Sequence, residues 1–315
     1  MAAIDIGSNS IRQLIADVTP GGQIRVVDEM KAAPRLGAGI GSAHRLAPHA
    51  MERATEAVTR MATLARQRGA ARIVAVATSA VREATNAREF VDMVQRSAHL
   101  PVRVLDGRGE ALLGYRSALA HFDLGSGRTV VTDIGGGSLE LVLCGAGLVD
   151  RLVSLPLGAL RLTEQYLGAG SSRRAVKSLR RDVRAQLRQH LPAREWRNAR
   201  IVGSGGTFTN LAGMALARQG MRAARTVHGT RVTRLELEHI LDAVQGMSLS
   251  ERLTVPGLNA GRADIIVAGL AVIAEVLARL DARSVVVSAY GIREGLLLET
   301  ARAGGRPAPE EQSAP

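Results

Sequence analysis

Two short glycine-rich segments are the first places in this sequence where chemistry could occur. Asp5-Ile-Gly-Ser-Asn-Ser10 recurs 128 positions later as Asp133-Ile-Gly-Gly-Gly-Ser138. Glycine lets the backbone approach a ligand closely and turn successive N–H groups inward, which creates a nest for an anion. We therefore expect each segment to wrap a phosphate group, with an ordinary β-hairpin turn as the alternative. The expected phosphate-binding residues are Gly7, Ser8, Asn9, Ser10, Gly135, Gly136, Gly137 and Ser138.

The two aspartates that precede these turns form a candidate metal site. Asp5 and Asp133 each lie where a predicted strand ends and a turn begins. Hard carboxylate ligands suit Mg²⁺, which keeps several water ligands and bridges phosphate oxygens rather than filling an all-protein cage. The alternative is that both aspartates only cap their turns.

Three further charged residues could act on a phosphate held by these turns. Glu110 opens a predicted helix and could serve as a general base toward water, or be only a favourable charge at a helix N-terminus. Glu140 lies on the strand that leaves the second turn and could orient the same water. Arg82 follows a buried strand and could reach a phosphate, unless it is an ordinary surface arginine.

A third glycine-rich stretch, Gly203-Ser-Gly-Gly-Thr207, follows a predicted strand and opens a helix. That order directs backbone N–H groups and the positive end of the helix dipole toward an anion. The stretch is not a P-loop, because no Gly-Lys-Ser/Thr follows it, and it does not match the dinucleotide-binding fingerprint.

Alternating strand and helix patterns must position these turns. Short strand patterns dominate residues 3–30, and strands then alternate with helices at 48–68, 86–98 and 109–121, which is typical of an α/β layer fold. After a glycine-rich connection at 123–128 the pattern restarts and ends with helices at 261–280 and 291–302. We therefore expect two similar domains that face each other across a cleft. Their predicted ranges are 1–122 and 123–303, followed by a flexible tail at 304–315.

Composition limits the classes of function. The chain has 315 residues, a formal net charge of +12 and only 2% aromatic residues. The charge fits plain surface arginine, a nucleic-acid partner or a polyanionic small substrate, and the scarcity of aromatic rings argues against a nucleic-acid partner. The single Cys144 excludes an internal disulfide and cysteine-based zinc sites. Because the sequence has no signal-peptide pattern and no long apolar run, we expect a cytoplasmic protein without a membrane partner.

One helix pattern carries a row of basic side chains. Within residues 172–191, apolar residues form one face and basic residues the other. The simpler interpretation is a solvated surface, and the alternative is a track for a long polyanion. The basic residues are Arg173, Lys177, Arg180, Arg184 and Arg188.

Together these segments resemble the exopolyphosphatase/guanosine pentaphosphate phosphohydrolase (Ppx/GppA) family of the actin-like ATPase and sugar kinase superfamily. The resemblance covers nearly the whole chain, in order. The matching segments are Asp5–Ser10, Ala77–Arg82 with Asn86, Gly109-Glu110-Ala111, Asp133–Glu140, Gly203–Thr207, Pro256-Gly-Leu with Arg262-Ala-Asp264, and Tyr290–Gly295.

The resemblance implies two actin-like (ribonuclease H-like) domains and an enzyme that releases terminal phosphate from inorganic polyphosphate or from pppGpp. It implies Mg²⁺ as cofactor, with Mn²⁺ or a monovalent cation as further candidates, and a homodimer. Glu110 corresponds to the general base, and Asp133 with Glu140 to further catalytic positions. The implied phosphate contacts are Ser8, Asn9, Arg82, Gly135, Gly205, Gly206 and Thr207.

One departure from the family pattern keeps other functions open. Members often have two acidic residues before the alanine at position 111, whereas this chain has Gly109 and then Glu110. A (p)ppGpp- or polyphosphate-binding regulator with weak turnover is therefore an alternative to a hydrolase. A kinase or ATPase that uses the same cleft for ATP is another. Longer members carry a further C-terminal HD-like domain, and we expect this chain to be of the short two-domain form.

Overall fold

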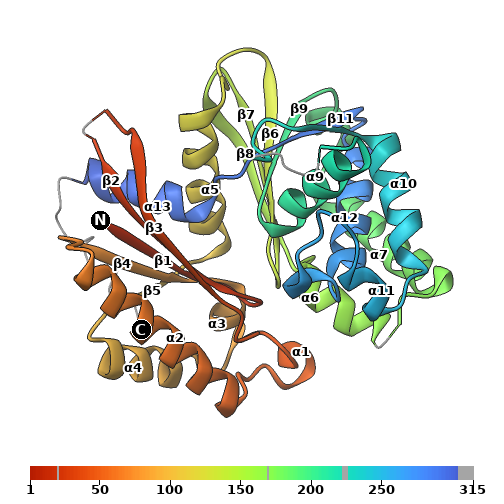
Figure 1. Cartoon of the computed structure of the whole chain (residues 1–315). Coiled ribbons are helices and arrows are strands. Elements are labelled where there is room, and N and C mark those ends of the chain that lie inside the picture. The colour runs from red at the N-terminus through yellow and green to blue at the C-terminus, as the bar shows by residue number, and fades with distance from the viewer. Residues whose placement is uncertain (20, 169, 222–225, 304–315) are drawn as a thin grey trace.

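The structure is a computed structural model that describes residues 1–19, 21–168, 170–221 and 226–303, and it contains two β-sheets with helices around them (Figure 1). The predicted tail at 304–315 lies outside these residues. The first sheet comprises, in spatial order, β3 (Ile24–Ala32), β2 (Ile11–Val18), β1 (Ala2–Ile6), β4 (Ile73–Ala77) and β5 (Val102–Val104). The second comprises β10 (Arg231–Thr233), β11 (Ser284–Val287), β9 (Arg200–Ser204), β6 (Arg128–Ile134), β7 (Leu139–Gly145) and β8 (Leu148–Leu155).

Both sheets are built on one topology. In the first, β1 pairs antiparallel with β2 and parallel with β4, and in the second β6 pairs antiparallel with β7 and parallel with β9. Strands β3 and β8 extend the antiparallel sides, whereas β5 and β11 extend the parallel sides. This agreement explains the 128-residue repeat and confirms the expected α/β fold with two related halves.

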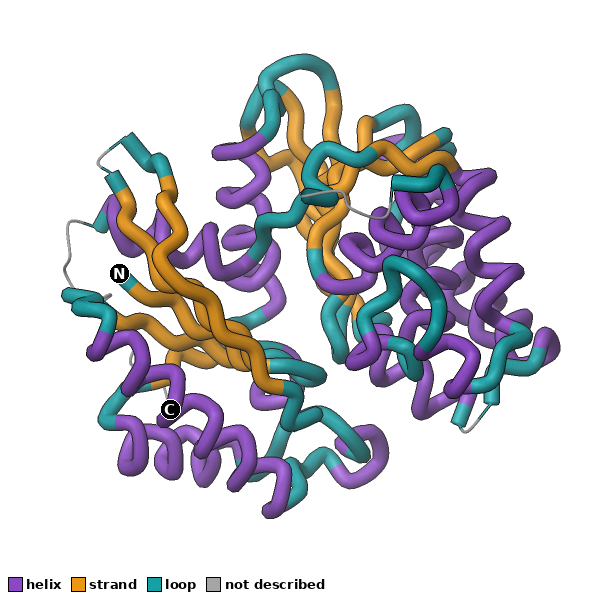
Figure 2. Tube along the Cα trace, viewed as in Figure 1, coloured by secondary structure: helices purple, strands orange, loops and turns teal. Residues whose placement is uncertain are grey.

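Helices α2 (Pro48–Gln67) and α4 (Ala87–Ala98) cover one face of the first sheet (Figure 2). Pro48 begins α2, where its missing N–H costs no hydrogen bond. The buried side of α2 carries mostly alanine, methionine and valine, so small and flexible apolar side chains fill this part of the core. Two short helices, α1 (Ile40–Ala43) and α3 (Ser79–Glu83), lie at the ends of the strands.

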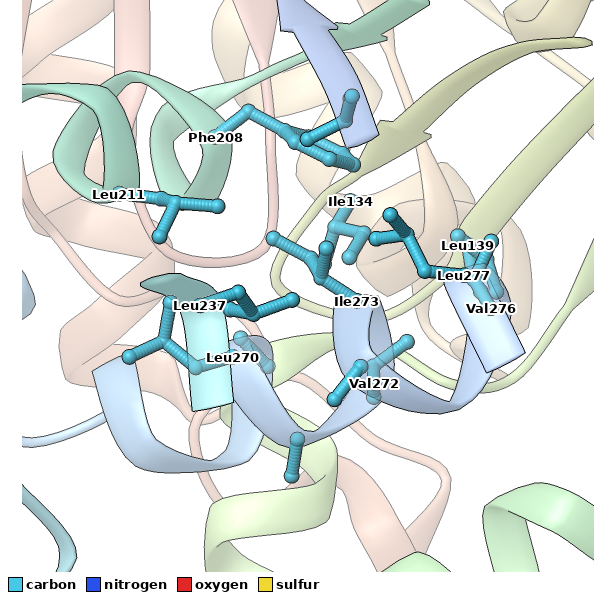
Figure 3. Close-up of a cluster of buried hydrophobic side chains, with 14 of the residues drawn as sticks. Ile134, Leu139, Phe208, Leu211, Leu237, Leu270, Val272, Ile273, Val276 and Leu277 are labelled. Carbon is cyan, nitrogen blue, oxygen red and sulfur yellow. The ribbon is translucent and has the colours of Figure 1, made fainter. Parts of the chain in front are cut away.

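The second half is built around helix α12 (Ile266–Arg279), which is buried along nearly its whole length (Figure 3). The predicted helix at 261–280 is wrong at its start, because a 3₁₀ turn at Ala260–Arg262 precedes α12 and three non-helical residues separate the two. The other helices here are α6 (Ala159–Leu162), a π-helical turn (Thr163–Leu167), α7 (Arg173–His190), α8 (Ala193–Trp196), α9 (Gly206–Arg218), α10 (Arg234–Gln245) and α11 (Leu249–Leu253).

Two helices connect the halves. Helix α5 (Gly107–His121) packs against the second sheet through Tyr115, and helix α13 (Ile292–Arg302) packs against α5 and the first sheet through Leu297. A Cβ at Gly295 would lie 2.0 Å from the carbonyl oxygen of Leu113, so only glycine allows the two helices to approach this closely. The predicted boundary after residue 122 separates the strands of the two sheets. The chain nevertheless returns to the first half at α13, which the predicted ranges had placed in the second.

Two arginines of the basic face predicted on α7 form ion pairs with other helices of the same chain. Arg180 donates hydrogen bonds to Glu238 and Glu275, and Arg184 donates to Glu275 at 2.8 Å. Burial raises the pKa of Glu275, but the two guanidinium groups outweigh it and hold the pKa below its usual value. These two arginines therefore secure α7 to its neighbours, which argues against a polyanion track along the whole helix. None of the helices within the described ranges is long and apolar enough to cross a membrane.

Candidate active site between the two sheets

A cavity between the two halves brings together most of the predicted site residues. The two repeated turns, the two aspartates and the N-terminus of α9 all open into it. The predicted residues that line the cavity are Asp5, Gly7, Ser8, Asn9, Ser10, Glu110, Asp133, Gly135, Gly136, Gly137, Ser138, Gly205 and Gly206. The remaining three predicted residues, Arg82, Glu140 and Thr207, lie behind this lining.

The first turn has its carbonyl groups bound from behind. The backbone N–H of Gly37 donates to the carbonyl of Ser8 at 2.8 Å, and that of Arg35 donates to the carbonyl of Asn9 at 3.3 Å. Among the described residues, no acceptor meets the N–H groups of Ser8 and Asn9. Because buried backbone donors need a partner, these two N–H groups are available to an anion in the cavity.

The second turn is held in the same way by the start of α6. The N–H groups of Ala159 and Leu160 donate to the carbonyls of Gly135 and Gly136, at 3.0 and 2.9 Å. Within the described part of the chain, the N–H groups of Gly136 and Gly137 have no acceptor. Helix α6 therefore turns the carbonyls away from the cavity, which leaves the donors on the cavity side.

Glycine is required in the second turn because the two halves touch there. A Cβ at Gly136 would lie 3.0 Å from the backbone nitrogen of Asn9, and a Cβ at Gly137 would lie 2.2 Å from Oγ of Ser79. The glycines thus allow the second turn to approach the first turn and α3. This close approach places the free donors of both turns around one small volume.

The two aspartates occupy equivalent positions of the two sheets. In the strand registers Asp5 lies opposite Arg12, and Asp133 lies opposite Glu140. Burial raises the pKa of Asp5 to about 6, with Arg293 opposing the rise and Asp133 reinforcing it. Burial also raises the pKa of Asp133, although the hydroxyl of Ser204 donates to it at 2.7 Å.

The two aspartates are candidate ligands for a divalent metal. Oδ1 of Asp5 is buried and has no hydrogen-bond partner, so a ligand in the cavity would satisfy it. Among the described residues no group of three or more acidic, histidine or cysteine side chains could hold a metal. Two carboxylates suit Mg²⁺, which takes its remaining ligands from water and phosphate oxygens.

Glu110 lies in the first turn of α5, where Asp106 caps the helix by accepting a hydrogen bond from the N–H of Gly109 at 2.6 Å. Nη1 of Arg82 donates to Oε2 of Glu110 at 2.9 Å. Burial raises the pKa of Glu110 to about 7, although Arg82 opposes the rise. A carboxylate with this pKa is well placed to accept a proton from water near neutral pH.

Glu140 lies deeper, on β7. It accepts a hydrogen bond from Oγ of Ser154 at 2.8 Å, and its side chain is almost fully buried. Burial raises its pKa well above the usual value, and the nearby charge of Glu110 adds to the rise. Glu140 is therefore buried beside Glu110 and does not itself line the cavity.

Two predicted phosphate contacts have other neighbours in the structure. Arg82 contacts Glu110 and the carbonyl of Leu105, not the cavity. Thr207 packs against Gly269 of α12, where a Cβ on the glycine would lie 2.5 Å from its Cγ2. Two residues further along α9, Thr209 lines the cavity.

Sequence reasoning missed three cavity-lining arginines as site residues: Arg12, Arg262 and Arg293. The guanidinium of Arg262 is buried, and within the described residues its Nε and one terminal nitrogen have no partner. Burial lowers the pKa of Arg262 to about 10, and burial also lowers that of Arg12. Arg12 could have been found from its charge within an otherwise largely apolar strand. Arg262 and Arg293 stand in segments that carry the family resemblance.

Known proteins resemble this chain over nearly its whole length. The model of the Ppx/GppA phosphatase family matches residues 14–303. "Exopolyphosphatase 2" of Mycobacterium tuberculosis is 35% identical over 96% of this chain and 98% of its own length. A crystal structure of the Aquifex aeolicus Ppx/GppA family member matches with a TM-score of 0.79 and 28% identity, over 97% of this chain and 98% of that one.

A second solved structure supports the fold. An exopolyphosphatase from Cytophaga hutchinsonii superposes with a TM-score of 0.87 at 24% identity, over 96% of this chain and 97% of that one. The matched residues include the second repeated turn, Glu110, Asp133 and Glu140, whereas the first turn, Asp5–Ser10, precedes them. From this match and the arrangement of the cavity, we conclude that the chain belongs to the Ppx/GppA phosphatase family.

Proposed function

We propose that this protein is a hydrolase that releases the terminal phosphate of inorganic polyphosphate. The observation that carries the proposal is the pair of facing turns, whose free N–H groups surround the volume beside Glu110. Relatives named exopolyphosphatase that align over nearly the whole chain support the same substrate.

The proposed reaction is an in-line attack of water on the terminal phosphorus. Glu110 takes a proton from the water while the water oxygen bonds to phosphorus. The anhydride P–O bond breaks, its electron pair stays on the shortened polyphosphate, and orthophosphate leaves. The N–H groups of the two turns would stabilise the charge on the transferred phosphoryl oxygens.

Asp5 and Asp133 would hold a Mg²⁺ ion in this proposal. The bound ion would supply positive charge that neutralises the phosphate oxygens. The buried, unpartnered Oδ1 of Asp5 supports this assignment.

The substrate class is proposed from charge. Arg12, Arg262 and Arg293 line the cavity beside the two turns, where their guanidinium groups can bind phosphate oxygens. Both polyphosphate and pppGpp carry consecutive phosphates that could use these contacts. We therefore propose pppGpp, which the family resemblance implies, as the second candidate substrate.

The test measures phosphate release from long polyphosphate, short polyphosphate and pppGpp, each with Mg²⁺ and with EDTA. We expect release from at least one substrate with Mg²⁺ and its loss with EDTA. Binding without release would favour the regulator, and transfer from ATP to an acceptor would favour the kinase. Either result would contradict the hydrolase.

Glu110→Gln tests the proposed general base. Because the amide cannot accept the proton, we expect kcat to fall by about 10²-fold or more while KM changes little. The matched control is Glu89→Gln, an exposed position on α4 that is remote from the cavity. Near-normal turnover in Glu110→Gln would contradict the assignment.

A further inference from the structure

We infer that Arg82 is a positioning residue for Glu110: it holds one carboxylate oxygen and thereby presents the other to the cavity. The inference rests on the proposed function, because it gives Glu110 the role of base. It replaces the phosphate contact that the sequence had predicted for Arg82.

Arg82 is fixed between two acceptors. It lies near the end of the short helix α3, and its Nη1 donates to the carbonyl of Leu105 at 2.8 Å and to Oε2 of Glu110 at 2.9 Å. Leu105 is itself anchored, because its N–H donates to the carbonyl of Ala77 at 2.9 Å. The guanidinium therefore has a defined position relative to the strands of the first sheet.

Glu110 lies between Arg82 and the cavity. The Glu110 side chain is 5% exposed and lines the cavity, whereas Arg82 does not line it. No described residue donates a hydrogen bond to Oε1 of Glu110. With Oε2 bound from behind, Oε1 is the oxygen that remains for a water molecule.

The charges around Glu110 give the contact a second consequence. The charged groups that face this carboxyl are Arg82 from α3, Asp5 from β1, Asp133 from β6 and Glu140 from β7. Arg82 is the one cation among them, so it favours the ionised form of Glu110, which is the form that can accept a proton. The three carboxylates act in the opposite direction.

A direct contact between Arg82 and phosphate is disfavoured by the same geometry. To reach a ligand, the guanidinium would have to leave two acceptors, one of them a buried carboxylate. Leaving a buried charge without its partner is unfavourable. The cavity already has Arg12, Arg262 and Arg293 for phosphate.

The test compares Arg82→Met, Arg82→Lys and a control, Arg88→Met. Arg88 is an exposed arginine on α4 that forms no ion pair with any described residue. Steady-state phosphate release from polyphosphate is measured from pH 5.5 to 9. We expect kcat of Arg82→Met to fall about tenfold or more with KM within about twofold. The midpoint of the acidic limb of its kcat–pH profile should shift to higher pH by about one unit. In Arg82→Lys this shift should be smaller.

A second readout does not depend on turnover. In protein carrying ¹³C-labelled glutamate, the Glu110 carboxyl is titrated by NMR and assigned through Glu110→Gln. Its midpoint should lie higher in Arg82→Met than in the wild type. This measurement remains informative if Arg82→Met is partly unfolded, because Arg82→Lys and Arg82→Gln can then be titrated instead.

The outcomes separate the two proposals. A large rise in KM with an unchanged pH limb would overturn the positioning role and restore the phosphate contact. Unchanged kinetics and an unchanged Glu110 midpoint would also overturn it. If the wild type releases no phosphate, the proposed function fails, and the Glu110 midpoint alone decides whether Arg82 holds this carboxyl.

Discussion

Single residues give the two related halves different chemistry. Arg12 and Glu140 occupy equivalent positions, each opposite the aspartate that precedes the last residue of the first strand of its sheet. The first half thereby contributes a cation that can face phosphate, and the second contributes a buried carboxyl group close to Glu110. The repeat is therefore symmetric in backbone and opposite in charge at this position.

Glu140→Gln should make the protein more stable and less active. The folded-state pKa of Glu140 is raised, so the folded protein loses stability as the pH rises above the unfolded value near 4.5. Glutamine removes that penalty. Thermal unfolding should show a gain of about 2 °C or more at pH 8 that shrinks toward pH 5. An equal gain at both pH values, or the same gain in the exposed control Glu89→Gln, would contradict the explanation.

At the scale of elements, short segments prepare the turns for anions. The N-terminus of α6 binds the carbonyls of the second turn, and the segment that follows β3 does the same for the first. Each of these segments follows the third strand of its sheet. These segments pack so closely against the turns that a larger side chain in them would displace the turn backbone.

Gly158→Ala tests the support that α6 gives to the second turn. The backbone of Gly158 suits alanine, with φ of −72°, but a Cβ there would lie 2.3 Å from the backbone nitrogen of Gly137. The turn must shift, so we expect kcat/KM for polyphosphate to fall by about 10²-fold. The control is Gly114→Ala in α5, where a Cβ meets nothing within 4 Å. Equal kinetics in the two variants would refute this role of α6.

In the whole molecule, polar contacts tie the halves together across the cavity. Arg35 pairs with Asp264 at 2.5 Å, Arg161 pairs with Glu83, and the N–H of Gly39 donates to Glu164 at 3.2 Å. At the end of α5 and just before α13, the rings of His121 and Tyr290 stack with centroids 3.8 Å apart. The facing turns therefore depend on contacts between segments far apart in the chain.

A charge exchange tests one of these ties. Arg35→Asp and Asp264→Arg each place like charges together, and each should lower kcat/KM for polyphosphate by about fivefold, because a half-exposed pair contributes about 1 kcal/mol. The double variant restores opposite charges and should recover part of the loss. Thermal unfolding of all three variants serves as the control for folding. A double variant as impaired as the two single variants combined would show that this pair does not hold the halves together.

The sequence by itself determined the elements, the repeat and most of the cavity lining. Strand-turn-strand patterns and glycine turns are local, so the spacing of Asp5, Asp133 and the two turns predicts them without knowledge of distant contacts. The family resemblance then selected Glu110 among several helix-opening acids. In the structure, the two predicted turns, Asp5, Asp133 and Glu110 line one cavity.

Only the tertiary structure decided which charges meet. That Arg82 binds Glu110, that Arg180 and Arg184 bind Glu275, and that α13 returns to the first sheet all depend on segments brought together by packing. No local periodicity records such partners, because a long charged side chain fits an exposed position and a paired one equally well. The physical reason is burial, because an unpaired charge is costly only when it is removed from water. Which charges are buried is known only from the packing of the two halves.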